Sequence, residues 1–349
     1  MINKTRVGII FGGQSPEHEI SIQSAKNVYE ALDKSRYEPI LIGISKSGKW
    51  LALSATEFNK IVSSPLQALQ EKKSSLLPYF SEYIRDQKLD VVFPLVHGEN
   101  GEDGTLQGFL KILSIPFVGA GVLGSAIGMD KDVMKRLLRD ASIPIVKFLV
   151  FYKKNRENIN FIKIKTELGL PFFVKPANGG SSVGVSKVSK MSDFAEAVNN
   201  AFEYDRKILI EQGIDAREIE CSVLGTRERV ASVPGEIIPS HEFYDYDAKY
   251  VDEVGARLEI PAKLTTEQVK DIQELAIGAC EVLCIDGMAR VDFFIDQRTD
   301  KLYLNEVNTI PGFTTVSMYP KLWEASGISY EELISRLIML ALERRLISR

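Results

Sequence analysis

The sequence predicts an amino-terminal α/β domain with an open parallel sheet, followed by two α+β domains. Up to about residue 125, apolar runs that end in glycine alternate with segments of helical periodicity. After about residue 130, two strands flank a glycine–serine loop, which predicts a β-hairpin. The 349 residues also exceed what one hydrophobic core usually supports. We therefore expect three domains, covering residues 1–125, 126–215 and 216–349.

In the first domain the expected strands alternate with helices, and this βαβ order predicts a parallel sheet with both faces covered. Residues 54–88 are polar and weakly patterned, and no element is assigned there. The expected strands are Val7–Phe11, Pro39–Ile44 and Val91–Val96, and the expected helices span 22–32 and Leu106–Leu113.

The rest of the chain mixes strands and helices without the crossover rhythm of a parallel sheet. The expected strands are Val146–Phe151, Phe172–Pro176, Val183–Val188, Lys207–Gln212, Glu218–Leu224, Met288–Ile295 and Lys301–Val307. The expected helices are Lys131–Asp140, Asn158–Leu168, Ser192–Phe202, Glu267–Leu283 and Tyr330–Arg345.

Composition excludes several classes of protein. A net charge of −4 provides no positive field for nucleic acid or an anionic membrane, so neither is an expected partner. No run of about 18 apolar residues occurs, and the amino terminus lacks a signal-peptide core. Three cysteines cannot build a disulfide framework, and we interpret them as reduced thiols in a cytoplasmic protein.

The segment KPANGGSSVGVSKV, Lys175–Val188, is the strongest local signal for phosphate binding. Its small residues would let several backbone N–H groups approach a phosphate, and Lys175 adds a positive charge. The segment lacks the GK[ST] ending of a Walker loop. An ordinary glycine-rich hairpin turn is the alternative interpretation.

Two strands near the carboxyl end carry candidate metal ligands. Arg290 and Asp292 share one strand face, as do Glu306 and Asn308, because residues two apart point the same way. Asp, Glu and Asn oxygens suit Mg²⁺, which fills its remaining positions with phosphate oxygens. The alternative is a solvated polar face. It fits poorly with the alternating apolar neighbours Val291, Phe293, Tyr303 and Val307, which indicate that the other face is buried.

Three further segments contain candidate polar residues at strand or helix ends. Glu211 follows a strand and could lie at a hinge beside a purine, with Glu218 near a ribose, although a plain loop is the alternative. Ser15 is a candidate N-cap beside Glu17, at a helix terminus that would favour a carboxylate. His97 follows a strand, where open α/β sheets bind ligands. All three histidines are expected in loops rather than in the core.

Taken together, these segments resemble the D-alanine–D-alanine ligase family of the ATP-grasp superfamily over essentially the whole chain. The motifs that carry the resemblance occur in family order: GGQSPEHEIS, HGENGEDGTLQG, GMDKD, VKPANGGSSVGVSKV, EFYDYDAKY, ARVDFF and NEVNTIPGFTTVSMYPKL. The resemblance implies the ATP-grasp fold, with ATP between the second and third domains, Mg²⁺ or Mn²⁺ as two ions, and an acyl-phosphate intermediate.

The resemblance also implies roles for individual residues. For ATP binding these are Lys131, Lys175, Ser182, Glu211, Gly213, Ile214, Glu218 and Lys249, and for metal binding Asp292, Glu306 and Asn308. For catalysis they are Glu17, Ser181, Tyr250, Arg290 and Gly312, and for substrate binding His97, Ser317 and Met318. The chain departs from the family at Gln212, where members often carry Lys, and at Gly213, where an adenine-stacking aromatic is missing.

The resemblance implies ATP-dependent joining of two D-alanine molecules to D-alanyl-D-alanine, for peptidoglycan precursor synthesis. Three alternatives to this activity stay open. The chain could be another ATP-grasp carboxylate–amine ligase, a ligase joining D-alanine to D-lactate, or a nucleotide-binding regulatory module without turnover. The intact set of lysines and acidic residues argues against the regulatory module. D-Alanine and ATP are the expected partners, and we expect a homodimer.

Overall fold

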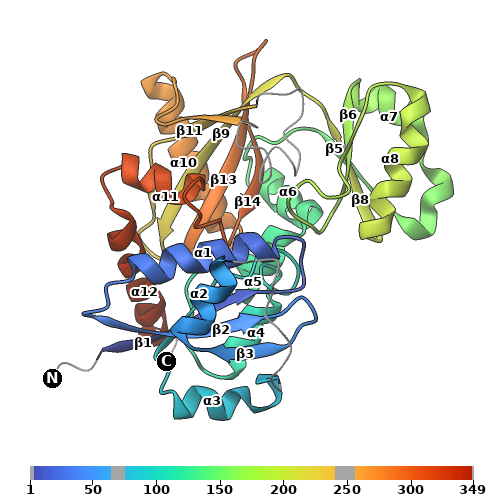
Figure 1. The fold of residues 1–349 in the computed structure, drawn as a ribbon. Coiled ribbons are helices and arrows are strands. Elements are labelled where there is room, and N and C mark those ends of the chain that lie inside the picture. Colours follow the sequence, from blue (N-terminus) through green and yellow to red (C-terminus); the bar gives the residue numbers. More distant parts are fainter. Residues whose placement is uncertain (1–3, 64–74, 240–255, 348–349) are drawn as a thin grey trace.

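The computed structural model describes residues 4–63, 75–239 and 256–347, which are organised around three sheets (Figure 1). The first sheet is amino-terminal, the second lies in the middle of the chain, and the third is carboxyl-terminal. Lys249 and Tyr250 fall outside the described residues. Within the described ranges, no helix is both long and apolar enough to cross a membrane.

The first sheet has the strand order β3-β2-β1-β4. β1 pairs in parallel with β2 and β4, as predicted, whereas the edge strand β3 pairs antiparallel with β2. A tight turn, closed by the Ser45 N–H to the Lys49 carbonyl at 2.9 Å, joins β2 to β3, and such a turn can connect only antiparallel neighbours. The strands are β1 (Thr5–Gly12), β2 (Tyr37–Ile44), β3 (Trp50–Leu53) and β4 (Val91–Pro94).

Apolar cores cover both faces of this sheet, as the sequence predicted. Alternate residues of β1 point to opposite faces, so Ile9 belongs to one core and Ile10 to the other. The surrounding helices are α1 (His18–Ala31), α2 (Ala55–Ser63), the 3₁₀ turn η2 (Leu77–Tyr79), α3 (Phe80–Asp86) and α4 (Thr105–Ile112).

The second sheet is antiparallel, in the order β5-β8-β6-β7, and contains the predicted hairpin between residues 172 and 188. Phe161 and Ala197 of the two helices pack with Val174 and Ile210 of the strands in one core. The elements are β5 (Phe148–Tyr152), η3 (Lys153–Asn158), α7 (Phe161–Leu168), β6 (Phe172–Pro176), β7 (Ser186–Val188), α8 (Met191–Tyr204) and β8 (Lys207–Gln212).

The third sheet, in the order β12-β11-β9-β13-β14 with β10 beside β9, is also antiparallel. One face packs on α10, which begins with a capping box formed by Thr265 and Gln268. The elements are β9 (Ala216–Gly225), β10 (Val230–Ala231), β11 (Gly235–Pro239), β12 (Ala256–Glu259), α10 (Thr266–Val282), β13 (Gly287–Asp296) and β14 (Leu302–Asn308).

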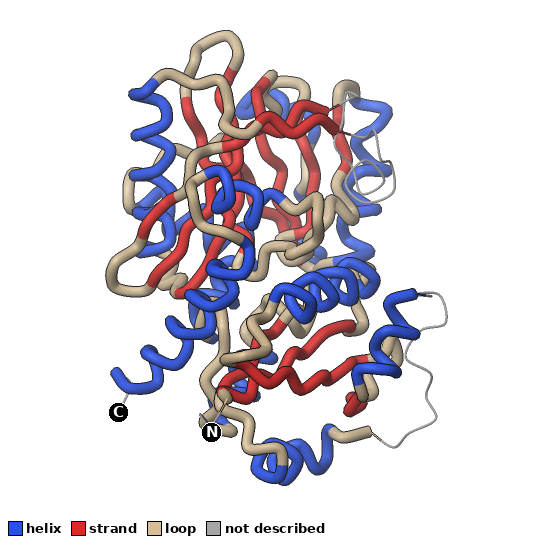
Figure 2. Tube along the Cα trace, turned by 60° about the vertical axis from the view of Figure 1, so that its left-hand side comes forward, coloured by secondary structure: helices blue, strands red, loops and turns tan. Residues whose placement is uncertain are grey.

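Four further helices link the sheets. Met134 and Leu138 of α6 pack in the core of the third sheet, whereas Leu333 and Leu337 of α12 pack in that of the first sheet. Figure 2 shows α12 running down from the region of the third sheet towards the first. The helices are α5 (Val122–Met129), α6 (Lys131–Asp140), α11 (Met318–Ala325) and α12 (Tyr330–Ile347).

Candidate functional site

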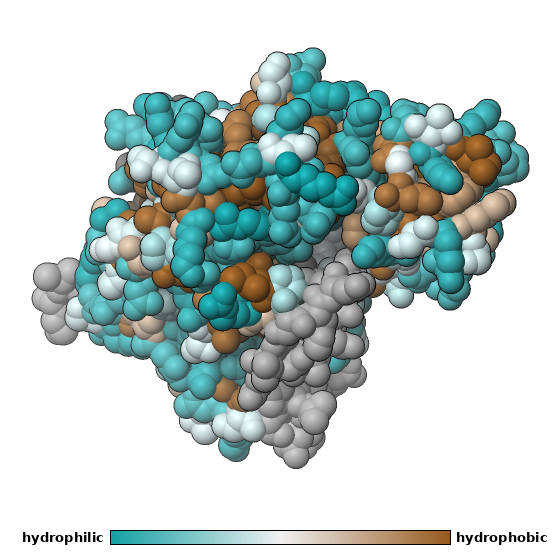
Figure 3. Space-filling view, turned by 90° about the horizontal axis from the view of Figure 1, so that it is seen from above, coloured by the Kyte–Doolittle hydropathy of each residue, from teal (hydrophilic) through white to brown (hydrophobic). Residues whose placement is uncertain are grey.

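The predicted site residues that the structure describes line two adjoining cavities. A cavity of about 190 Å³ opens between the first sheet and the third. A larger cleft of about 830 Å³ lies between the second and third sheets, where the surface is recessed between the two lobes in Figure 3. Lys131, Ser181, Glu218 and Glu306 line both, so the two spaces meet at these residues.

The predicted residues divide between the cavities as follows. The smaller cavity also contains Glu17, His97, Arg290, Asp292, Asn308, Gly312, Ser317 and Met318. The cleft also contains Lys175, Ser182, Glu211, Gly213 and Ile214.

A β-bulge shapes the acidic wall of the site. Asp292 pairs with Glu306, but the next residue, Phe293, pairs with Leu304, so Asn305 is an extra residue in β14. The bulge allows Leu304 and Val307, three apart, both to enter the core of the third sheet, while Asn305 and Glu306 line the cavities. The sequence predicted the shared face of the acids but not the bulge.

Arg290 and Asn308 hold Asp292 in a fixed orientation. The Arg290 guanidinium donates to both Asp292 oxygens at 2.8 Å, and its Nε lies 2.9 Å from Glu220 Oε2. Asn308 Nδ2 donates to Asp292 Oδ2 at 3.0 Å. In the described part of the chain, no three His, Cys, Asp or Glu side chains form a metal cage. Two carboxylates and an amide fit magnesium, which takes few protein ligands beside phosphate.

Lys131 reaches this wall from the first turn of α6. Its Nζ donates to the Gly179 carbonyl at 2.7 Å and lies 3.6 Å from Glu306 Oε2. Its backbone N–H donates to the Ala177 carbonyl at 2.9 Å. The lysine therefore connects the root of the glycine–serine loop to the acidic wall.

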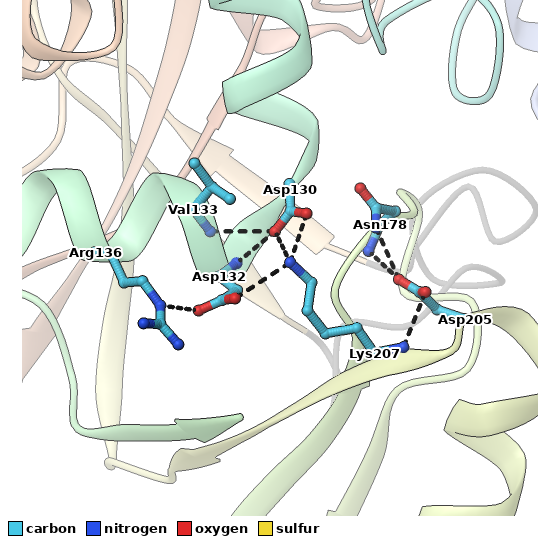
Figure 4. Close-up of polar contacts among 7 residues, drawn as sticks. All are labelled: Asp130, Asp132, Val133, Arg136, Asn178, Asp205 and Lys207. Carbon is cyan, nitrogen blue, oxygen red and sulfur yellow. Dashed lines mark hydrogen bonds and ion pairs between the residues drawn. The ribbon is translucent and has the colours of Figure 1, made fainter. Parts of the chain in front are cut away.

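A charged cluster fixes the start of α6 against the second sheet (Figure 4). The Asp130 carboxylate accepts from the N–H groups of Asp132 and Val133 at 3.1 Å, and so caps the helix. Lys207 Nζ donates to both Asp130 oxygens, at 2.7 and 2.6 Å, and to Asp132 at 3.2 Å. We infer that this cluster orients Lys131, because Asp130 precedes it directly.

The glycine–serine loop contacts the amino-terminal domain. Ser181 Oγ donates to Glu17 Oε1 at 2.5 Å, although 164 positions separate the two residues. Ser181 and Ser182 both have positive φ, at 52° and 60°. Glu17 itself is the N-cap of α1. The prediction that Ser15 is the N-cap is therefore wrong: its hydroxyl accepts from the Glu17 N–H at 3.3 Å and donates to the His97 carbonyl at 2.8 Å, outside the helix.

The prediction that the histidines lie in loops is confirmed for His97, which follows β4, but is wrong for His18, the first residue of α1. The prediction that they lie outside the core is wrong for both. His18 and His97 are buried, and His241 lies outside the described residues. His18 Nδ1 lies 2.6 Å from the Gly13 carbonyl, which is a structural contact. His97 Nδ1 lies 3.1 Å from the Ile310 carbonyl, and burial lowers the pKa of the His97 imidazole.

Residues of α1 and α12 hold the loop that contains Gly312. The Phe313 N–H donates to Ser24 Oγ at 3.1 Å, and the Phe313 carbonyl accepts from Asn27 Nδ2 at 3.0 Å and from the Tyr330 hydroxyl at 2.7 Å. A Cβ on Gly312 would lie 2.6 Å from Ser317 Oγ. The backbone next to Gly312 is therefore fixed at Phe313, and Ser317 leaves no room for a side chain at Gly312.

Several lining residues were missed from the sequence. Phe173 of β6 and Phe294 of β13 place aromatic rings at the cleft, although Gly213 itself supplies none. A Cβ at Gly213 would lie 2.6 Å from the Pro171 carbonyl, which leaves no room for a side chain there. Glu102 lines the smaller cavity, and its position within HGENGEDGT was the only signal for it.

Glu102 makes the stability of the fold depend on pH. Burial raises the pKa of the Glu102 carboxyl from 4.5 to about 8, and the nearby Glu17 adds to the rise. Between these values the folded protein holds a proton that the unfolded chain has released, so stability falls as pH rises. Glu102→Gln cannot titrate, and we expect its stability relative to wild type to increase between about pH 5 and about pH 8.

Urea unfolding at several pH values measures this difference. Glu99→Gln, at an exposed position in the same loop, is the matched control and should follow wild type at every pH. If stability depends on pH in the same way for Glu102→Gln and wild type, the raised pKa of Glu102 is contradicted.

The fold and the two cavities define a class of protein. Two antiparallel sheets that enclose a cleft lined by lysine and acidic side chains are those of an ATP-grasp protein. Family models described as the D-Ala–D-Ala ligase N-terminus and C-terminus match residues 6–120 and 137–339. The chain therefore belongs to the D-alanine–D-alanine ligase family.

Individual relatives agree with this assignment. The chain is 50% identical to a D-alanine–D-alanine ligase of Oceanobacillus iheyensis, covering 98% of this chain and 96% of the relative. It is also 50% identical to D-alanine–D-alanine ligase A of Escherichia coli K12, covering 98% and 97%. The solved D-alanine–D-alanine ligase of Coxiella burnetii superposes with a TM-score of 0.83 at 36% identity, covering 99% and 96%. A D-Ala:D-Ser ligase of Enterococcus faecalis gives 0.83 at 34% identity, covering 97% and 100%.

Proposed function

We propose that this protein joins two D-alanine molecules to D-alanyl-D-alanine at the expense of ATP, for peptidoglycan precursor synthesis. The observation that carries the proposal is the meeting of the two cavities at Lys131, Ser181 and Glu306. A nucleotide in the cleft would direct its terminal phosphate to this point. An amino acid in the smaller cavity would meet it there.

ATP would occupy the cleft between the second and third sheets. Phe173 and Phe294 are suited to contact the adenine ring, and the positive charges of Lys131 and Lys175 are suited to the phosphates. The proposed ATP-binding residues are Lys131, Lys175, Ser182, Glu211, Gly213, Ile214 and Glu218, together with Lys249 outside the described residues.

Asp292, Glu306 and Asn308 would hold magnesium or manganese, as two ions. Bound there, the metal would neutralise charge on the transferring phosphoryl group. The protein's own contribution is to orient the ligands, which Arg290 and Asn308 do for Asp292.

The reaction has two steps whose residues belong to the smaller cavity. A carboxylate oxygen of the first D-alanine attacks the terminal phosphorus and ADP leaves, which forms D-alanyl phosphate. The amine of the second D-alanine then attacks the acyl carbon, loses a proton and expels phosphate. Arg290 and the Gly312 N–H would stabilise the tetrahedral oxyanion. Glu17 would bind the first ammonium, His97 would lie near its carboxylate, and Ser317 and Met318 would contact the second D-alanine.

Incubation of the purified chain with ATP and D-alanine tests the function directly. We expect equal amounts of ADP, phosphate and D-alanyl-D-alanine. ATP binding without turnover would instead support the regulatory module. D-Lactate and D-serine belong in the same assay as competing second substrates, since a neighbouring structure is a D-Ala:D-Ser ligase. The cytoplasmic location, the homodimer and the domain boundaries near 125 and 215 stay proposals.

Loss of the Ser181 hydroxyl is expected to loosen closure over the first substrate. Ser181→Ala removes the hydrogen bond to Glu17, worth about 1 kcal/mol, so the KM for the first D-alanine should rise about fivefold. With nucleotide bound, amide exchange across residues 179–184 should be faster in Ser181→Ala than in wild type. Ser192→Ala, at an exposed position on α8, is the control. Unchanged exchange and KM would remove Ser181 from the closure mechanism.

A further inference from the structure

Beneath the nucleotide cleft lies a lysine that no part of the proposed mechanism uses. Lys135 is on α6, one helical turn after Lys131, and its side chain is fully buried. Its Nζ lies 3.2 Å from Glu211 Oε1, while Glu211 Oε2 lies 2.5 Å from Lys175 Nζ. Glu211 and Lys175 line the cleft, so Lys135 reaches the same carboxylate from behind.

The charges of these three side chains do not cancel. Two ammonium groups share one carboxylate, which leaves one net positive charge at the cleft wall. If Lys135 were neutral, Glu211 would balance the charge of Lys175 alone. The wall would then offer no net attraction to an anion, because the short contact between Lys175 and Glu211 would form a neutral pair.

The pKa shifts of Lys135 and Glu211 are consistent with a net charge of one for these three side chains. Burial, the largest influence, lowers the pKa of the Lys135 ammonium to about 8, although Glu211 opposes the change. Burial alone would raise the pKa of the Glu211 carboxyl, but Lys135 and Lys175 together outweigh it, and the net pKa is lowered. Beyond these two residues, the charged group that faces Lys135 from the third sheet is Glu306 of β14.

Packing alone does not account for a lysine at this position. Among the described residues, neither Lys135 Nζ nor Glu211 Oε1 makes a hydrogen bond of good geometry, although the two atoms form an ion pair. Burying a charge in this way is costly, and an apolar side chain of similar volume is often at least as stable. The neighbouring Met134 and Leu138 of α6 are buried apolar residues.

We propose that Lys135 is a positioning residue that neutralises Glu211 from beneath and so leaves the charge of Lys175 available to the phosphates of the nucleotide. The inference rests on the proposed function, because it takes the cleft to be the ATP site. It predicts that Lys135 affects binding of the phosphates but not of the adenosine part.

The test compares the affinities of the full-length protein for ADP and for adenosine, measured by calorimetry in the absence of divalent metal. The ratio of the two dissociation constants isolates the phosphate contribution, because any distortion of the adenine pocket affects both ligands. Lys135→Met removes the charge and keeps the volume, and the preference for ADP should fall about tenfold or more. Arg139→Met removes one positive charge from the exposed face of the same helix and should leave the ratio unchanged.

A double variant tests the cause. In Lys135→Met/Glu211→Gln the carboxylate is absent as well, so Lys175 is again uncompensated and the preference for ADP should return towards wild type. Lys135→Gln, which keeps a neutral donor towards Glu211, provides the same comparison if the methionine variant does not fold. An unchanged ratio in the single variants, or no recovery in the double variant, would overturn the proposal. Failure of wild type to bind ADP at all would instead refute the proposed ATP site.

Discussion

Glu306→Gln is expected to reduce turnover by at least about a hundredfold, which corresponds to about 2.7 kcal/mol of transition-state stabilisation. Glu306 lies opposite Asp292 in the β13–β14 pair, and its Oε2 is 3.6 Å from Lys131 Nζ. The substitution keeps the volume but removes one charge from the proposed metal ligands. The measurement is the rate of phosphate release at saturating ATP and D-alanine, over a range of magnesium concentrations.

The position of Glu306 predicts how the defect should respond to metal. A weakened site should require more magnesium for half-maximal rate, and manganese should recover part of the activity. Glu274→Gln on the exposed face of α10 is the control, since its side chain is 66% exposed and lines neither cavity. Activity within a few-fold of wild type for Glu306→Gln would exclude Glu306 as a metal ligand.

Elements with strong periodicity were predictable from the sequence. Helix α6 and strands β6 and β8 begin and end at the predicted residues, because each combines a clear apolar pattern with turn residues at its ends. The missed helices include α2, α5 and α11, with eight or nine residues each. The missed strands are short, such as β10 with two residues and β12 with four. So few residues cannot display a period, and their pairing depends on neighbours far along the chain.

In the candidate site, too, local features were predictable from the sequence, whereas contacts between distant segments were not. That Arg290 and Asp292 share one strand face, and Glu306 and Asn308 another, follows from strand alternation, which is local information. The bond between Ser181 and Glu17, and the approach of Lys135 to Glu211, depend on how separate sheets are placed against one another. In the sequence, Lys135 does not differ from the other charged residues of its helix. Only its burial in the structure distinguishes it from them. The extra residue Asn305 likewise becomes visible only once the strand register is known.

Arg290→Met should lower turnover by about 10²–10³-fold with little change in the KM for ATP. Arg290 lines the smaller cavity beside Gly312 and is directed there by its paired bonds to Asp292. Because it would meet charge that develops only in the transition state, its loss should reduce kcat rather than substrate affinity. Arg290→Lys keeps the charge but not the planar pair of donors, so we expect only partial recovery. Steady-state kinetics of the two variants provide the measurement.

A structural explanation for the same loss can be separated from the catalytic one. Removal of Arg290 leaves the buried Glu220 carboxylate without the guanidinium 2.9 Å away, which should also destabilise the fold. Adding Glu220→Gln to Arg290→Met removes that charge, so the thermal unfolding temperature should recover in part, because Asp292 also loses its paired bonds to Arg290. If Arg290 acts in the site, on the oxyanion or by orienting Asp292, kcat stays low in the double variant, because no donor has been restored. The oxyanion role further requires that the magnesium concentration for half-maximal rate stays unchanged. Recovery of kcat together with stability would show that Arg290 acts only by holding β9 against β13.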